Sequence, residues 1–212
     1  MLIAYLMGLS IGVHILNLLT IPALVFIYYF RTTKAVTWKG LLYASLIAGA
    51  ILLAINGIII PYTVLIGMHV DIWFVNSLGL PVNTGIVVFV LLMFVALGWA
   101  VLFTHKRGYR VWNMIAVCVT MIMLGFSSYA SVTIRALANP PMNSNNPNNP
   151  AALLSVLNRD QYGNRPLIYG ASYAAPIESY TEKRVYNYNP ATEQYDELTT
   201  VDKYVYPDRF MH

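Results

Sequence analysis

Residues 85–103 read GIVVFVLLMFVALGWAVLF, a run without a single charged side chain. A helix needs about twenty apolar residues to cross the hydrocarbon core of a bilayer. Three other stretches, 2–30, 41–60 and 111–129, also lack Asp, Glu, Lys and Arg. The sequence therefore predicts an α-helical integral membrane protein with about four transmembrane helices, at residues 2–30, 41–60, 85–103 and 111–129.

The composition supports a membrane protein and divides the chain in two. Of the 212 residues, 58% are hydrophobic and 10% are charged, and the mean hydropathy is +0.57; soluble domains have roughly 25% charged residues. Residues 1–130 contain one acid, Asp71, whereas residues 131–212 contain the other acids. We therefore expect a transmembrane region over 1–130 and a polar tail over 131–212. The basic residues form no clustered face of the kind that binds nucleic acid, so the expected partner is the lipid bilayer.

The basic residues of the transmembrane region predict its orientation. Lys and Arg in short loops remain on the cytoplasmic side of a membrane. The loop at 61–84 contains neither residue type. The tail and this loop are therefore expected outside, which in a bacterium is the periplasm, and four spans would place the N-terminus there too. The basic residues fall in two other loops: Arg31, Lys34 and Lys39 in the first, and Lys106, Arg107 and Arg110 in the second.

The loop at 61–84 is unusually apolar, so we expect it to lie in the membrane interface or to dip into the protein, with Trp73 at headgroup level. His69 and Asp71 lie two residues apart, and they would share a face only on an extended strand. A metal site would need at least one more ligand. The single cysteine, Cys118, lies in an apolar run and is interpreted as a core residue. The sequence predicts no metal site.

The tail predicts a small α+β segment. Asn149 and Pro150 suit the N-cap and first position of a helix, and the leucines at 153, 154 and 157 give that short helix an apolar face. Strands are predicted at 166–169, 184–188 and 198–206, the last two joined as a β-hairpin across Asn189-Pro190.

Three residues are candidates for binding. His14 belongs to a polar cluster with Ser10 and Asn17, opposite the helix-packing pair Gly8 and Gly12. It can be a ligand or proton carrier, or a neutral histidine hydrogen-bonded to a neighbour.

Arg135 follows the fourth span and can bind a phosphate bidentately or anchor to lipid headgroups. Arg159 lies at the end of the tail helix, where its side chain can satisfy the terminal carbonyls. Both residues are basic groups on the predicted outer side of the membrane.

Two stretches carry a resemblance to a known family. These are GLSIGVHILNLLTIP (8–22) and IRALANPP (134–141), the second continuing through Asn148-Asn149-Pro150 to LNRDQYGNRPLIYG (157–170). They resemble a family of bacterial multi-spanning proteins, formerly a domain of unknown function, now grouped with protein O-mannosyltransferase-like enzymes of the GT-C type. The resemblance covers most of the chain.

The resemblance implies part of a glycosyltransferase in the bacterial inner (cytoplasmic) membrane. It would transfer a sugar, mannose, from a polyprenyl-phosphate sugar donor to Ser or Thr of an exported protein acceptor. The family's general base is an acidic residue of a first outer loop, upstream of the motif at Gly8. This chain has no such loop, so we expect an internal portion of a larger enzyme that is inactive alone. The residues to test are His14, Arg135 and Arg159; catalytic residues stay unassigned, and no cofactor is implied.

Two other functions remain open. The chain could be a non-enzymatic membrane anchor whose periplasmic tail docks a protein partner. It could also be a small transporter, although the sequence shows neither an inverted repeat nor a charged pair at mid-membrane depth.

Overall fold

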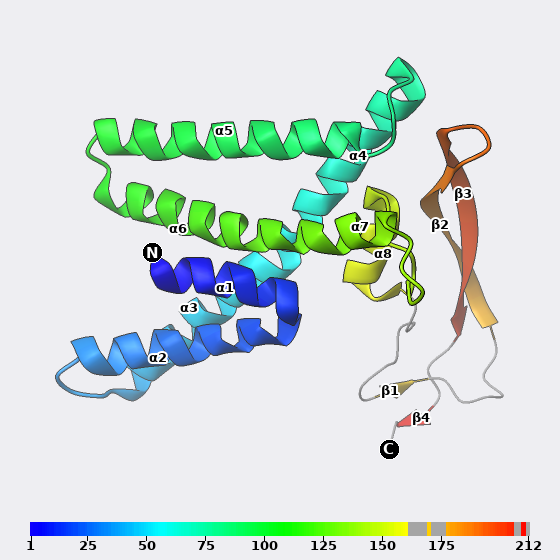
Figure 1. Ribbon diagram of the computed structural model, residues 1–212. Coiled ribbons are helices and arrows are strands. Elements are labelled where there is room, and N and C mark those ends of the chain that lie inside the picture. Colours follow the sequence, from blue (N-terminus) through cyan, green and yellow to red (C-terminus); the bar gives the residue numbers. More distant parts are fainter. Residues whose placement is uncertain (161–168, 171–176, 206–208, 211–212) are drawn as a thin grey trace.

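A computed structural model describes residues 1–160, 169–170, 177–205 and 209–210 (Figure 1). Most of the described chain is helical, with α1 and α2 stacked beside α6 and α5 and a long α3–α4 run crossing them. The helical elements are α1 (Leu2–Val13), the 3-10 helix η1 (Ile15–Leu19), α2 (Thr20–Thr32), α3 (Trp38–Leu53), the π-helix η2 (Ala54–Ile59), α4 (Ile60–Leu78), α5 (Thr84–Lys106), α6 (Arg110–Phe126), the 3-10 helix η3 (Ser127–Tyr129), α7 (Ala130–Leu137) and α8 (Pro150–Asn158).

Within the described residues, four strands follow the helices. β2 (Ile177–Asn189) and β3 (Gln194–Val205) form an antiparallel hairpin, and β1 (Tyr169–Gly170) pairs antiparallel with β4 (Arg209–Phe210). The hairpin predicted across Asn189-Pro190 is confirmed, with longer strands. Residues 166–168 and Tyr206, also predicted as strand, lie outside the described residues.

Three helical runs among the described residues are long and apolar enough to cross a membrane. They are Trp38–Leu78, Thr84–Lys106 and Arg110–Leu137. The expectation of a helical membrane protein with a small sheet is therefore supported; three runs of membrane length are found where four spans were predicted. The last run also continues past residue 131, where the composition changes.

The single span predicted over residues 2–30 is wrong. The chain breaks at His14, whose backbone is extended (φ −159°, ψ 122°), and α1 and α2 contain only 12 and 13 residues. The two helices run in opposite directions (Figure 1). The N-terminus therefore lies toward the end of the bundle that carries the α2–α3 turn, whereas one continuous span would place it at the other end.

The loop predicted at 61–84 is mostly helix. From Trp38 the helical run continues for 41 residues to Leu78, which at 1.5 Å per residue is about 61 Å, twice the thickness of the hydrocarbon core. Pro61, expected to end the second span, lies at the start of α4 after the π-helical segment η2. Proline and π-turns bend helices without always ending them. The apolar residues that follow Pro61 therefore continue the helix.

Glycine brings α1 and α6 into close contact. A Cβ atom at Gly8 would collide with the Ile122 carbonyl oxygen, and one at Gly125 would lie 2.5 Å from the Leu9 nitrogen and from the Tyr5 oxygen. The predicted role of Gly8 in helix packing is confirmed. A continuous apolar core joins this contact to α2, α4 and α8: Ile11, Leu18, Ile21, Ile55, Ile60, Val64, Met123, Phe126 and Leu153.

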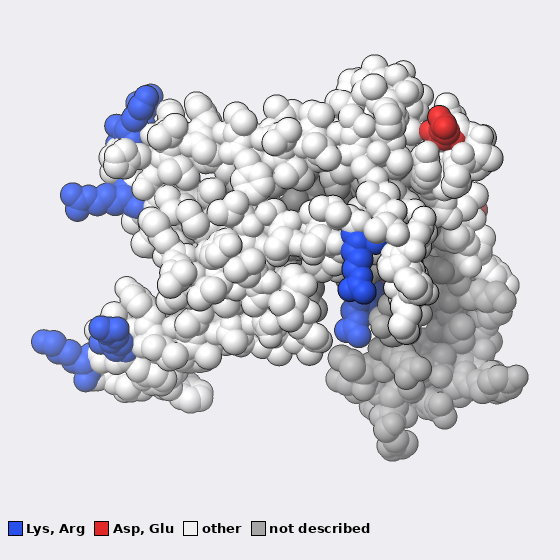
Figure 2. All heavy atoms as spheres, viewed as in Figure 1, with Lys and Arg blue, Asp and Glu red and all other residues white. Residues whose placement is uncertain are grey.

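Basic side chains lie at both ends of the bundle, and acidic ones are visible at one end (Figure 2). Lys and Arg of the α2–α3 and α5–α6 turns gather at one end, as the prediction of a shared face requires. The α7 and α8 helices and the hairpin lie at the opposite end (Figure 1). The α8 helix begins as predicted, because the Asn149 side chain accepts a hydrogen bond from the Ala152 N–H (2.9 Å) and Pro150 is the first residue.

Candidate functional site

His14 forms the turn between α1 and η1. Its Nδ1 atom accepts a hydrogen bond from the Leu16 N–H (3.2 Å), so the ring caps η1. The Ser10 carbonyl oxygen accepts from the His14 N–H (2.9 Å) and from the Asn17 side-chain amide (3.1 Å). The polar cluster predicted on one helix face thus stabilises a tight turn, and the His14 side chain is exposed.

This turn lies beside the helix that leads to Arg135. A Cβ atom at Gly12 would be 3.0 Å from the Ser128 hydroxyl oxygen in η3, and α7 follows η3 without a break. His14 and Arg135 therefore come from neighbouring elements, at the end of the bundle opposite the basic turns.

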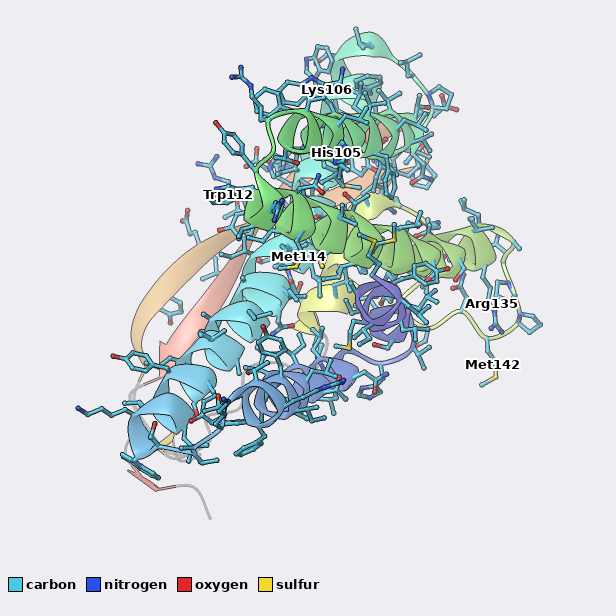
Figure 3. All side chains as sticks on the ribbon, turned by 90° about the vertical axis from the view of Figure 1, so that its left-hand side faces the viewer. His105, Lys106, Trp112, Met114, Arg135 and Met142 are labelled. Carbon is cyan, nitrogen blue, oxygen red and sulfur yellow. The ribbon has the colours of Figure 1, made fainter. Side chains whose placement is uncertain are left out.

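Arg135 is an exposed residue of α7. Figure 3 shows it near Met142, which belongs to the segment after α7, at the right-hand side of the view. Within the described residues, its guanidinium makes no hydrogen bond or ion pair with another side chain. It is therefore a cation without a side-chain partner in the part of the chain that the structure describes.

Arg159 ends α8 in the left-handed conformation (φ 60°, ψ 31°). Its backbone N–H donates to the carbonyl oxygens of Ser155 and Val156. The backbone thus satisfies these carbonyls, a role that we also predicted for the Arg159 side chain. The side chain is exposed, and Figure 2 shows basic side chains against α7 and α8 at this end.

The best-organised polar cluster surrounds Asp71, which is fully buried (0% exposed) in α4. Its Oδ1 atom accepts hydrogen bonds from the N–H groups of Gly85 (2.8 Å) and Ile86 (3.4 Å), and its Oδ2 atom accepts one from Asn83 (3.1 Å). These donors belong to the start of α5, whose own N-cap residue provides no side-chain cap. Asp71 therefore caps α5 from a different helix, where a negative charge is stabilised by the helix dipole.

Tyr195 connects the same carboxylate to the hairpin. Its hydroxyl donates to Asp71 Oδ2 (2.8 Å). One turn further along α4, the Asn76 side chain pairs with the Tyr195 backbone: Nδ2 donates to its oxygen and Oδ1 accepts from its N–H, both at 2.9 Å. Tyr195 is only 4% exposed. Three hydrogen bonds to one residue thus fix the hairpin on α4.

Burial raises the pKa of Tyr195 above its ordinary value of 10.0, and the hydrogen bond to Asp71 and its negative charge raise it further. Because the folded-state pKa exceeds the unfolded one, the neutral phenol stabilises the fold fully below pH 10, and this contribution is lost as the pH rises above 10. The hairpin contact is therefore expected to weaken in strong alkali.

Absorbance at 295 nm during an alkaline titration can test this. We expect fewer than the sixteen tyrosines of the wild-type protein to ionise near pH 10, with the remaining ionisation, that of Tyr195 included, appearing at higher pH. In Tyr195→Phe this late step should be smaller by one tyrosine. A late step of equal size in both proteins would contradict the assignment.

Asp71 and His69 do not act together. The helix directs the two side chains to different sides. The His69 ring is exposed, and its Nδ1 atom lies 2.8 Å from the Leu65 carbonyl oxygen. The same ring contacts the Tyr186 ring edge-on, with 6.0 Å between the ring centroids. Within the described residues, no three His, Cys, Asp or Glu side chains converge as metal ligands. One signal in the sequence could have revealed the role of Asp71: a lone acid in an apolar stretch must find hydrogen-bond donors when it is buried.

The comparisons with known proteins give one match. Residues 1–37 match the family model described as the protein O-mannosyl-transferase TMEM260 N-terminal domain. This region covers α1, the His14 turn, η1 and α2. No curated protein and no solved structure matches the chain.

Proposed function

We propose that this chain is a membrane-embedded part of a GT-C-like glycosyltransferase that transfers a sugar, mannose, from a polyprenyl-phosphate donor to Ser or Thr of exported proteins. The match of residues 1–37 to an O-mannosyl-transferase domain carries the proposal. The three membrane-length helical runs are consistent with it, because such a donor is anchored in a bilayer. We place the enzyme in a bacterial inner membrane, with the end that bears α7, α8 and the hairpin in the periplasm.

In this proposal the chain binds the donor, and Asp71 does not serve as the general base. Asp71 is the single acid of residues 1–130, and its oxygens already accept hydrogen bonds from the start of α5 and from Tyr195. A base must be free to take a proton from the acceptor hydroxyl. The base would therefore come from a carboxylate other than Asp71.

Arg135 would bind the donor phosphate. A guanidinium suits a phosphate because it can donate two parallel, charge-assisted hydrogen bonds. Arg135 is exposed and unpaired within the described residues, on the helix beside the His14 turn. We extend the proposal to His14 and Arg159 as neighbouring polar groups for the sugar or the phosphate.

Photolabelling tests this assignment. The purified chain would be exposed to a polyprenyl phosphate mannose that carries a diazirine, and we expect labelled peptides from α7. Arg135→Gln should reduce labelling about tenfold or more, since a hydrogen bond to a charged group contributes roughly 1.5–3 kcal/mol.

Arg110→Gln is the matched control, because it removes an exposed arginine at the opposite end of the bundle. It should leave labelling unchanged. Equal labelling of wild type and Arg135→Gln would refute the role of Arg135, and no specific labelling at all would count against the glycosyltransferase proposal.

The alternative function, a membrane anchor with a docking tail, makes a different prediction. Such a tail should fold and bind its partner without the spans. The hydrogen bonds that join Tyr195 to Asp71 and to Asn76 favour the enzyme instead, because they make the hairpin depend on α4.

A further inference from the structure

An apolar groove runs between α2 and α3, which lie side by side in opposite directions (Figure 1). It has a free volume of about 490 Å³, within the roughly 300–1,000 Å³ of small-molecule sites. Hydrocarbon side chains form most of its surface. They include Ile21, Leu24 and Val25 from α2, and Ala44, Ile47 and Ile51 from α3.

The groove is open along its length and closed near the turn. Ala44 is small and almost buried (5% exposed), so α3 presents little side-chain volume toward α2 there. At the turn, the Tyr29 ring lies over Gly40 and its hydroxyl oxygen accepts a hydrogen bond from the Thr37 N–H (3.3 Å). This contact holds the two helices together beside the turn.

The length of the groove matches one leaflet of a bilayer. On α2 its lining extends from Ile21 to Thr32, which at 1.5 Å per residue corresponds to about 16 Å. The hydrocarbon core of a bilayer is about 30 Å thick. One acyl chain of a lipid in a single leaflet therefore fits the length of the groove.

Positive charge surrounds the closed end. Arg31, Lys34 and Lys39 are all exposed at the turn between α2 and α3, and Figure 2 shows basic side chains gathered there. The sequence contains no acid before Asp71. Basic segments beside a membrane attract anionic lipids at the cytoplasmic surface.

We propose that this groove binds one anionic phospholipid from the leaflet that faces the basic turns. One acyl chain occupies the groove between α2 and α3, and the phosphate lies among Arg31, Lys34 and Lys39. The apolar lining and the length of the groove match the acyl chain, and the basic residues at the turn match the phosphate. The site lies at the end of the bundle opposite Arg135 and is independent of the proposed sugar transfer.

Native mass spectrometry of the full chain, delipidated in detergent, tests whether the site prefers an anionic headgroup. The protein would be titrated with dioleoyl phosphatidylglycerol and, separately, with dioleoyl phosphatidylcholine. We expect one phosphatidylglycerol to bind at least tenfold more tightly than phosphatidylcholine. The double variant Lys34→Gln/Lys39→Gln should weaken phosphatidylglycerol binding about 25-fold, since each basic group near the surface is worth about fivefold.

The matched control removes two charges from the other basic turn. Lys106→Gln/Arg110→Gln lies at the same end of the bundle but between α5 and α6, and it should change binding less than twofold. An equal loss in both double variants would show general attraction to the basic surface and would overturn the site.

A second pair of variants tests the groove. Ile47→Trp should fill it and weaken phosphatidylglycerol binding about tenfold, whereas Leu46→Trp, at an exposed neighbour outside the lining, should not. Circular dichroism of all variants would establish that the helices persist. If Ile47→Trp has no effect on lipid binding, or if it changes instead the fraction of dimer, the proposal is wrong and the groove belongs to another occupant or a second copy of the chain.

Discussion

Replacing Asp71 with alanine is expected to destabilise the protein by about 4 kcal/mol. The change leaves the N–H groups of Asn83 and Gly85 and the hydroxyl of Tyr195 without their acceptor in a fully buried site. Each unsatisfied buried polar group costs about 1–3 kcal/mol. Reversible unfolding in mixed dodecyl maltoside–SDS micelles, followed by circular dichroism, measures the loss.

Val75→Ala is the control that distinguishes the effect of lost hydrogen bonds on stability from the effect of lost packing. Val75 lies one turn further along α4 and is 1% exposed, so the variant also opens a small cavity but removes no acceptor. We expect a loss of about 2 kcal/mol. Equal losses for the two variants would mean that the Asp71 hydrogen bonds add nothing to stability.

The hairpin should respond selectively to the Asp71 change. Because Tyr195 loses its hydroxyl partner, proteolysis of β2 and β3 is expected to accelerate more in Asp71→Ala than in Val75→Ala. Uniform acceleration across the chain would indicate global unfolding and contradict the connection from α4 to the hairpin.

Replacing Gly125 with alanine is expected to have the second-largest effect, a loss of about 3 kcal/mol. The added Cβ atom would lie 2.5 Å from backbone atoms of Tyr5 and Leu9 in α1, and a backbone cannot move aside as a flexible side chain can. Overpacking of this kind costs about 1–3 kcal/mol, sometimes more. The same unfolding measurement should show this loss in the free energy of unfolding.

Gly98→Ala is the control for Gly125→Ala. Gly98 lies within α5, and a Cβ atom there meets nothing within 4 Å. Because alanine favours helix by up to about 1 kcal/mol over glycine, this variant should be neutral or slightly more stable. A comparable loss at both positions would contradict the close α1–α6 contact.

Local chemistry was sufficient to predict several features from the sequence. The apolar runs at 85–103 and 111–129 lie within helices long enough to span a membrane. The Asn149-Pro150 cap and the hairpin turn were also correct, because capping and turn preferences act within a few residues. The position of the two basic turns at one end followed from the same patterns.

Other features depended on the neighbours of each residue. An apolar pattern does not distinguish one long helix from two short ones, so the break at His14 was missed, although the polar residues that stabilise the turn were noticed. For the same reason the helix beyond Pro61 was mistaken for a loop. Both errors arose because hydrophobicity indicates whether a stretch lies in an apolar environment, but does not indicate where the backbone turns or continues as a helix.

The amino-acid sequence alone was enough to indicate a helical membrane protein with a polar tail and to single out Arg135 as a basic residue close after the fourth predicted span, since these depend on composition and short-range patterns. The function of Asp71 emerged from the folded chain. Its partners at Gly85 and Tyr195 are 14 and 124 residues away, and no local pattern encodes contacts at such separations. Tertiary packing brings them together because a buried carboxylate must find its hydrogen-bond donors inside the protein.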